Sequence, residues 1–217
     1  MKKTVQNYVR RYDICQQNKY STLPPAGLLQ PLDIPQAVWT DLSMDFTTGL
    51  PKSHGYNVIS VAVDRLSKYS HFLLLKHPYT ARGVDEVFMW DVVRLHGIPN
   101  SIISDQDPIF LSHFWTELFQ LQSTKLKFSS AYHPQTYRQT KVVNRGLEAY
   151  LRCFAGEHPE QWSYWIPWAE FCYNTIWHAS INTNPFEVVY GQPPAHCFKS
   201  FNFRNSGGHS GTSTFRP

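Results

Sequence analysis

Two aspartates in this sequence stand at the ends of short apolar runs, where a strand would deliver a side chain to the edge of a sheet. Asp45 lies near the end of the run 39–46, and Asp105 directly follows the run 101–104. Carboxylate oxygens are ligands that Mg²⁺ prefers, and ligands gather at the carboxyl ends of strands in open α/β sheets. Taken singly, either aspartate is more typical of a turn or a cap. Their meaning therefore depends on the rest of the chain.

The elements that would position these aspartates follow a recognisable order, strands first and helices later. Apolar and β-branched runs predict strands at 39–46, 57–63, 69–75, 101–104 and 125–129. Apolar residues at helical spacing predict helices over 80–95, 110–121, from Thr136 or Thr140 to about 154, and 160–178. This order implies an α/β layered domain with a mixed five-stranded sheet.

A series of motifs extends in order across about residues 24–194. It includes MDFTTGLPKS (44–53), VDRLSKYSHF (63–72), VVRLHGIPNSIISDQDPIF (92–110), SSAYHPQT (129–136), VVNR (142–145), WAEFCYNT (168–175) and PFEVVYGQPP (185–194). These segments resemble the integrase catalytic core of gypsy-type (Metaviridae) LTR retrotransposon polyproteins. The resemblance implies an RNase H-like fold, in which helices flank the five-stranded sheet. It also implies DNA integration by metal-dependent strand transfer, with a 3′-hydroxyl as the nucleophile.

The resemblance further implies that two aspartates and a glutamate hold the catalytic ions, Mg²⁺ or Mn²⁺. Asp45 and Asp105 match the aspartates. Between Asp105 and Lys141 lie 141 − 105 − 1 = 35 residues, the spacing that the family uses before its glutamate, so Lys141 stands at the glutamate position. A lysine ammonium has three donors and no acceptor, so we expect weakened metal binding and impaired catalysis. The family's Asp-Gly before this helix is also replaced, by Tyr137-Arg138.

Two nearby acids could in principle replace the missing glutamate. Glu148 is seven residues after Lys141, which is about 10.5 Å along a helix that rises 1.5 Å per residue, and this is too far. Asp107 is two residues from Asp105. The sequence does not determine how the two side chains are placed, so Asp107 remains a candidate for the third carboxylate. We also expect the Lys141 amine to point toward Asp45 or Asp105, because an ammonium within about 4 Å relieves the repulsion between two carboxylates.

Basic residues indicate DNA as the partner. The formal net charge of +4 is compatible with nucleic-acid binding. Arg138, Lys141 and Arg145 are spaced to form a basic stripe on one helix face, and Lys125 and Lys127 could extend a phosphate-facing surface; for each one alone, a solvated charge is the alternative. The family also implies a homo-oligomer in the nucleus, with the cytoplasm as the other expected location.

The remaining segments are assigned by composition and by the same resemblance. Residues 1–20 correspond to a basic helical remnant of the family's zinc module, in which Cys15 matches one cysteine and Tyr12 replaces its partner. Structural zinc needs four ligands, so we expect no zinc. Residues 21–37 form a proline-rich linker, 38–195 the catalytic core, and 196–217 a disordered tail. We expect no membrane span, because no run of about 18 apolar residues occurs.

Other interpretations use the same scaffold. One is a non-catalytic nucleic-acid-binding or interaction module, and another is an RNase H-like nuclease with relaxed requirements. The aromatic residues between 162 and 177 could form a stacking platform for single strands, although packing against the sheet is the favoured interpretation. A strand-transfer assay that depends on divalent metal would separate the enzyme from the binding module.

Overall fold

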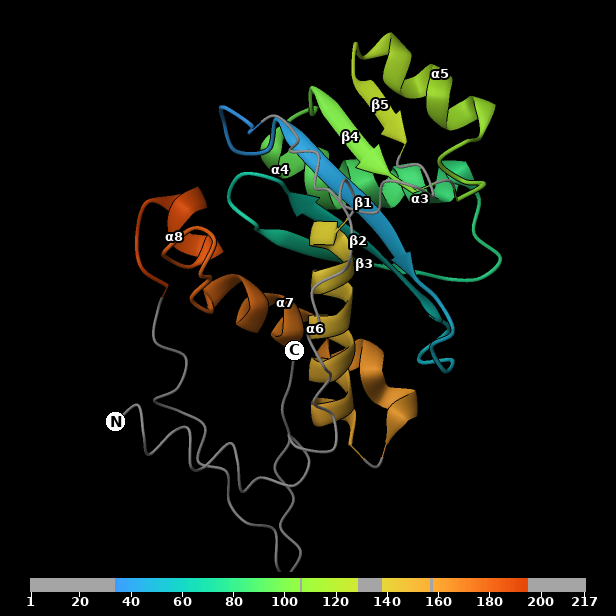
Figure 1. The fold of residues 1–217 in the computed structure, drawn as a ribbon. Helices are drawn as coiled ribbons and strands as arrows, with labels where there is room; N and C mark the ends of the chain where they lie inside the picture. The colour runs from blue at the N-terminus through green and yellow to red at the C-terminus, as the bar shows by residue number, and fades with distance from the viewer. Residues whose placement is uncertain (1–33, 106, 129–137, 157, 195–217) are drawn as a thin grey trace, which may run out of the picture.

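The computed structural model describes residues 34–105, 107–128, 138–156 and 158–194 (Figure 1). The expected basic helix at 1–20 with Cys15, most of the proline-rich linker and the expected disordered tail at 196–217 lie outside these residues. Within the described ranges, no helix is long and apolar enough to cross a membrane.

The order of the elements follows the predicted pattern. The strands are β1 (Asp41–Thr47), β2 (Val58–Asp64), β3 (Ser70–Leu75), β4 (Ser101–Ser104) and β5 (Lys125–Phe128). The helical elements are α3 (Ala81–Phe88), the π-helical η1 (Met89–Val93), α4 (Arg94–His96), α5 (His113–Leu121), α6 (Arg138–Ala155), the 3-10 helix η3 (Pro159–Trp165), α7 (Ile166–Thr175) and α8 (Pro185–Tyr190). The strand order is β3-β2-β1-β4-β5. Neighbours are antiparallel from β3 to β1 and parallel from β1 to β5, so the predicted mixed sheet is confirmed.

An apolar core covers each face of this sheet. On β2, Val58 and Ala62 belong to the core beneath α3 and α5, whereas Ile59, Val61 and Val63 belong to the core beneath α6 and α7. Figure 1 shows α6 crossing the face of the sheet opposite α3. Side chains of a strand alternate between the two faces. The buried apolar set therefore also decides which polar side chains point toward α6.

Several helices differ from the sequence prediction. The helix expected at 80–95 contains the π-helical turn η1, and α5 begins at His113 because the Ser112 hydroxyl caps it by accepting the Trp115 N–H. The helix expected at 160–178 is instead η3 followed by α7. Pro167 stands at the start of α7, where its missing N–H prevents a continuous α-helical ladder.

The short helix α8 was not predicted. It begins after Asn184, whose side chain accepts the Glu187 N–H, and it ends at Gly191, which has a left-handed backbone with φ +67°. Trp162 and Tyr173 are buried in the core beneath α6 and α7, which confirms the packing interpretation for these two aromatic residues. Trp177, in contrast, is 61% exposed.

Candidate functional site

The parallel pairing of β1 with β4 places the two aspartates side by side. Asp41 pairs with Ser101 and Ser43 with Ile103, which is an offset of 60 positions. The same offset, 45 + 60 = 105, aligns Asp45 with Asp105 at the carboxyl ends of adjacent strands. Leu42 and Met44 face the core beneath α3 and α5, so alternation turns Asp45 toward α6.

Asp45 is nearly buried, with 8% of its surface exposed. Its Oδ1 accepts the N–H of Phe46 at 2.8 Å, and its Oδ2 accepts a hydrogen bond of 2.7 Å from Nδ2 of Asn144 on α6. Burial, reinforced by the charge of Asp105, raises the pKa of Asp45 to about 7, against the opposing effects of the Phe46 N–H, Lys141 and Asn144. Asp45 therefore titrates close to neutral pH, well above the range of an ordinary aspartate.

Asp105 is half-buried and begins a pair of consecutive turns. Its Oδ1 accepts the N–H of Asp107 at 3.0 Å, and Oδ1 of Asp107 accepts the N–H of Ile109 at 2.9 Å. Burial raises the pKa of Asp105 and the charge of Asp107 adds to this, whereas the Asp107 N–H and Lys141 lower it. Asp107 thus adds negative charge beside Asp105, while one of its oxygens is engaged in the turn toward α5.

Lys141 acts electrostatically on both aspartates from the second turn of α6. Its ammonium opposes the burial effects and lowers the pKa of Asp45 and of Asp105; the expected orientation of its amine stays a prediction. Glu148, further along the helix, forms an ion pair of 3.3 Å with Arg152. A cation whose field reaches both carboxylates thus stands at the position where the sequence resemblance leads us to expect a third carboxylate.

Buried oxygens without a hydrogen-bond partner lie along the interface between β1 and α6. They are Oγ of Ser43, Oγ1 of Thr47, Oγ1 of Thr140 and Oδ1 of Asn144. Ser43 and Thr47 flank Asp45 on the same face of β1, and Thr140 lies one turn before Asn144 on α6. Buried polar atoms without partners are few in native proteins, and water, an ion or a ligand commonly satisfies them.

Within the part of the chain that the structure describes, the residues around Asp45 and Asp105 do not fit a two-ion site. Asp45 and Asp105 supply two carboxylates, but Lys141 brings a positive charge to the third position. No group of three or more His, Cys, Asp or Glu that could hold a metal ion occurs among the residues that the structure describes. Magnesium can be held by one or two carboxylates together with water, so this pair suits a single ion at most. Two-ion phosphoryl transfer requires both the attacking and the leaving oxygen to be clamped.

The basic residues expected to face DNA lie on the side of the sheet that carries Asp45. Leu126 packs into the core beneath α3 and α5, so its neighbours Lys125 and Lys127 on the edge strand β5 point to the opposite face, where they are exposed. Lys141 and Arg145 are exposed on α6. Arg138 begins α6, but its side chain lies outside the described part of the chain.

Asn144 is the site residue that sequence reasoning missed. It belongs to the VVNR segment and follows Lys141 by three positions, a spacing that puts two residues on the same helix face. That spacing, together with a polar residue on an otherwise apolar face, was the available signal.

Comparison with known proteins supports the sequence interpretation in part. No protein-family model matches the chain. The chain is homologous to the transposon Tf2-3 and Tf2-4 polyproteins of Schizosaccharomyces pombe, with 37% identity to each over 195 residues, or 90% of this chain. The matched region is 15% of each polyprotein, so the chain spans a small part of these curated relatives.

The fold is that of integrase catalytic cores. An intasome of simian T-cell lymphotropic virus in complex with PP2A regulatory subunit B56 gamma matches with TM-score 0.63 and 14% identity, over 100% of this chain and 73% of the other. The HTLV-2 integrase catalytic core domain in complex with magnesium gives TM-score 0.56 and 18% identity, over 69% and 95%. The BIV integrase core gives 0.54 and 20%, over 69% and 93%. The predicted RNase H-like integrase core fold is thereby confirmed.

Proposed function

We propose that this domain is a gypsy-type integrase core that still binds DNA but no longer joins it. The observation that carries the proposal is the position of Lys141, whose charge acts on both Asp45 and Asp105 where the family has a third carboxylate. The integrase fold and the homology to the Tf2 polyproteins support the origin of the domain. The departure that bears most on catalysis is the change of charge at Lys141.

Loss of strand transfer follows from the charge balance at the site. A glutamate would add a ligand oxygen and one negative charge, whereas Lys141 adds a positive charge and has no acceptor. The attraction of the two aspartates for a divalent cation is then weakened, and a second ion lacks its anchor. The raised pKa of Asp45, about 7, weakens the site further because a metal must compete with a proton for this carboxylate near neutral pH.

DNA binding can outlast catalysis because it depends on different residues. Affinity for duplex DNA comes mainly from Lys and Arg neutralising phosphates. Lys141 differs from a glutamate by two charge units, and Lys125, Lys127 and Arg145 are exposed on the same side of the sheet. We therefore expect sequence-tolerant binding in the micromolar range or weaker at physiological salt, with steep salt dependence.

Assembly and location belong to the same proposal. The HTLV-2 integrase core is known in a dimeric and a trimeric form, which makes self-association of this domain the expected behaviour. A chain that binds chromosomal DNA would act in the nucleus.

Fluorescence anisotropy with a short labelled duplex across a salt series tests DNA binding. Wild type should bind at low salt, and Lys141→Glu should bind more weakly with a shallower log–log slope. Arg82→Glu is the matched control, because it makes the same charge change at an exposed residue of α3 on the other side of the sheet. Undetectable wild-type binding at low salt, or an equal loss in Arg82→Glu, would favour an interaction module over a DNA-binding core.

A further inference from the structure

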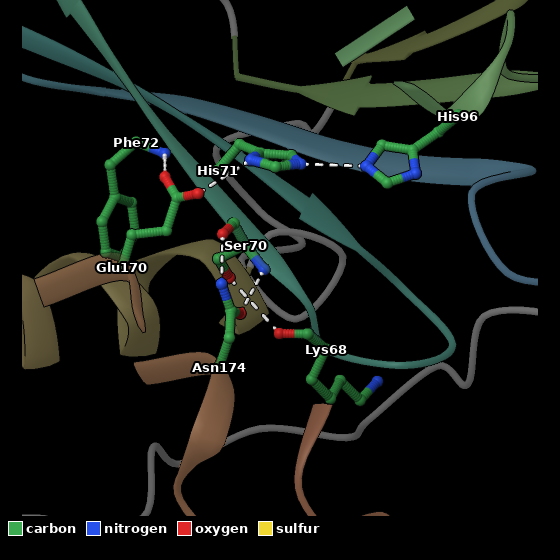
Figure 2. Close-up of polar contacts among 7 residues, drawn as sticks. All are labelled: Lys68, Ser70, His71, Phe72, His96, Glu170 and Asn174. Atoms are coloured by element: carbon green, nitrogen blue, oxygen red, sulfur yellow. Dashed lines mark hydrogen bonds and ion pairs between the residues drawn. The ribbon is translucent and has the colours of Figure 1, made fainter. Parts of the chain in front are cut away.

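Strand β3 is the outermost strand of the sheet that the described residues form, and side chains of α7 cover its outer edge. The outermost position of β3 in the strand order leaves the backbone groups of alternate residues pointing outward. The Asn174 side chain accepts the Ser70 N–H at 2.8 Å and donates to the Ser70 carbonyl at 2.9 Å. One turn earlier, Oε2 of Glu170 accepts the Phe72 N–H at 2.8 Å. Figure 2 shows both side chains reaching β3 from α7.

The other oxygen of Glu170 begins a chain of two imidazole rings. Oε1 of Glu170 lies 3.0 Å from Nδ1 of His71, and Nε2 of His71 lies 3.0 Å from Nε2 of His96 (Figure 2). The His96 ring in turn stacks on Trp39, with centroids 3.7 Å apart and planes 5° apart. The chain therefore links α7, β3, α4 and the segment before β1, which are far apart in the sequence.

Only one proton can lie between Nε2 of His71 and Nε2 of His96. The ring centroids are 5.2 Å apart while the two Nε2 atoms are 3.0 Å apart, so the nitrogens face each other along the line that joins the rings. Glu170 accepts, so Nδ1 of His71 carries a proton. Either neutral His71 then accepts from Nε2 of His96, or charged His71 donates to it. Once both rings are charged, two N–H groups face each other and the contact is repulsive.

A metal ion fits this arrangement less well than a proton. Zinc would need about four nitrogen, sulfur or oxygen ligands. Around the rings, as elsewhere in the described residues, no group of three or more His, Cys, Asp or Glu could hold an ion. The head-on approach of the two nitrogens is the geometry of a hydrogen bond.

Other titratable groups lie near the two rings. Burial raises the pKa of Tyr69, and its contacts with Tyr190 on α8 and with Glu170 add to the effect, so Tyr69 stays neutral through the acid and neutral range. Asp91 on η1 lines a cavity of about 640 Å³ together with His71 and Glu170. Burial, and then the charge of His71, lower the pKa of His96 to about 4.

We propose that Glu170, His71 and His96 form an acid-sensitive latch. The proton shared between the two rings holds α4 against β3. A second proton on the rings makes them repel and releases α4, whereas the contact of Glu170 with His71 keeps α7 in place. Release moves α4, which carries Leu95, and so opens the cavity that Leu95 lines. The latch gives a physical role to three motif segments, KYSHF, RLHG and WAEFCYNT, which lie away from the aspartates.

Imidazole ¹⁵N NMR of the full chain from pH 8 to 3.5 tests the shared proton directly. Nδ1 of His71 should be protonated at neutral pH, one of the two Nε2 atoms should carry a proton, and His96 should become charged only near pH 4. A His96 signal that titrates near the ordinary histidine value of about 6.5 overturns the latch. A shift of these signals on adding Zn²⁺ or EDTA would assign the rings to a metal instead, and would equally overturn it.

A variant tests whether the latch holds the fold. His96→Phe keeps a ring that can stack on Trp39 but cannot take a proton. Because the pKa of His96 is lower in the folded protein, the unfolded chain binds more protons between about pH 6.5 and 4, and wild-type stability falls as the pH falls. The ratio of the wild-type unfolding constant to that of His96→Phe should therefore increase as the pH falls through this window, by at most about tenfold for each pH unit.

His113→Phe, which removes an exposed histidine paired with Glu117, is the matched control and should keep the wild-type profile. Groups such as Asp45 are common to all three proteins and cancel in the differences. Amide exchange adds a local readout, because the Gly97 N–H, bonded to the Val93 carbonyl at the end of α4, should lose protection in acid before Val61 on β2, whereas in His96→Phe the two should respond alike. Identical pH profiles in wild type and His96→Phe contradict the latch, and if the variant does not fold, the NMR titration of wild type decides.

Discussion

Asn144 on α6 donates a hydrogen bond of 2.7 Å from its Nδ2 to Oδ2 of Asp45 on β1. This bond ties the helix that carries Lys141 to the strand that carries the first aspartate. The bond fixes the helix from which the charge of Lys141 acts on the two carboxylates, and the charge balance among these groups determines what the site can do.

Removing this hydrogen bond should cost most when Asp45 is ionised. Asn144→Ala should lower the free energy of unfolding by about 1.5–3 kcal/mol at pH 8.5, the usual range for a bond to a charged group, and by less at pH 5. Urea unfolding at the two pH values measures it. Asn57→Ala, which removes an exposed acceptor of the His77 N–H, should show no such difference. An equal loss at both pH values for Asn144→Ala would contradict the expectation.

Asp45 should make the protein less stable as the pH rises toward neutrality. Its pKa is raised from 3.8 to about 7 in the folded state, so the folded protein binds more protons than the unfolded chain between these values. Its contribution to stability is full below about pH 3.8, falls as the pH rises, and is lost above about 7. Asp45→Asn should remove this slope in unfolding measured from pH 4 to 8. An unchanged slope in the variant would show that Asp45 titrates normally.

Lys141 should hold the pKa of Asp45 down. Lys141→Ala should therefore raise it above 7, because the ammonium opposes the effects of burial and of Asp105. Carboxyl ¹³C NMR measures the titration. Arg145→Ala, one helical turn further along α6 and also exposed, should leave the titration near its wild-type position. If the two variants behave alike, Lys141 has no specific role at the aspartates.

The paired lysines on β5 should contribute to phosphate binding. Lys125→Ala combined with Lys127→Ala should reduce the log–log salt slope of duplex binding by up to about 1.8, or about 0.9 for each phosphate that is no longer neutralised. Arg82→Ala with Arg94→Ala removes the same charge from α3 and α4 and should leave the slope unchanged. A slope that responds equally to both pairs would mean that binding follows total charge.

The arrangement of the aspartates could be predicted because it follows from strand order. Asp45 and Asp105 each end an apolar run, and once the two strands are parallel neighbours their register decides the rest. Asn144 was harder to foresee, because its role depends on which face of α6 meets β1. The contact between His71 and His96 could not be read from the sequence, since it joins an edge strand to a short helix 25 residues away.

The helix boundaries differ from those that apolar spacing predicts where a local residue such as a proline or a cap interrupts or starts a helix. Periodicity alone predicted one helix over 160–178, but Pro167 divides it into η3 and α7. The π-helical turn at Met89–Val93 has the same apolar pattern as an α-helix, so no signal in the residues distinguishes it. The Asn184 cap and Gly191 would have been sufficient to predict α8.

Strand transfer itself tests the central claim most directly. A short duplex with a free 3′-hydroxyl is incubated with target DNA and Mg²⁺ or Mn²⁺, using wild type, Asp45→Asn as the blank and Lys141→Glu as the variant that restores the third carboxylate. Wild type should give no more joined product than Asp45→Asn, while all three proteins keep their fold. Robust joining by wild type that disappears in Asp45→Asn or Asp105→Asn would contradict the claim that Lys141 has ended catalysis.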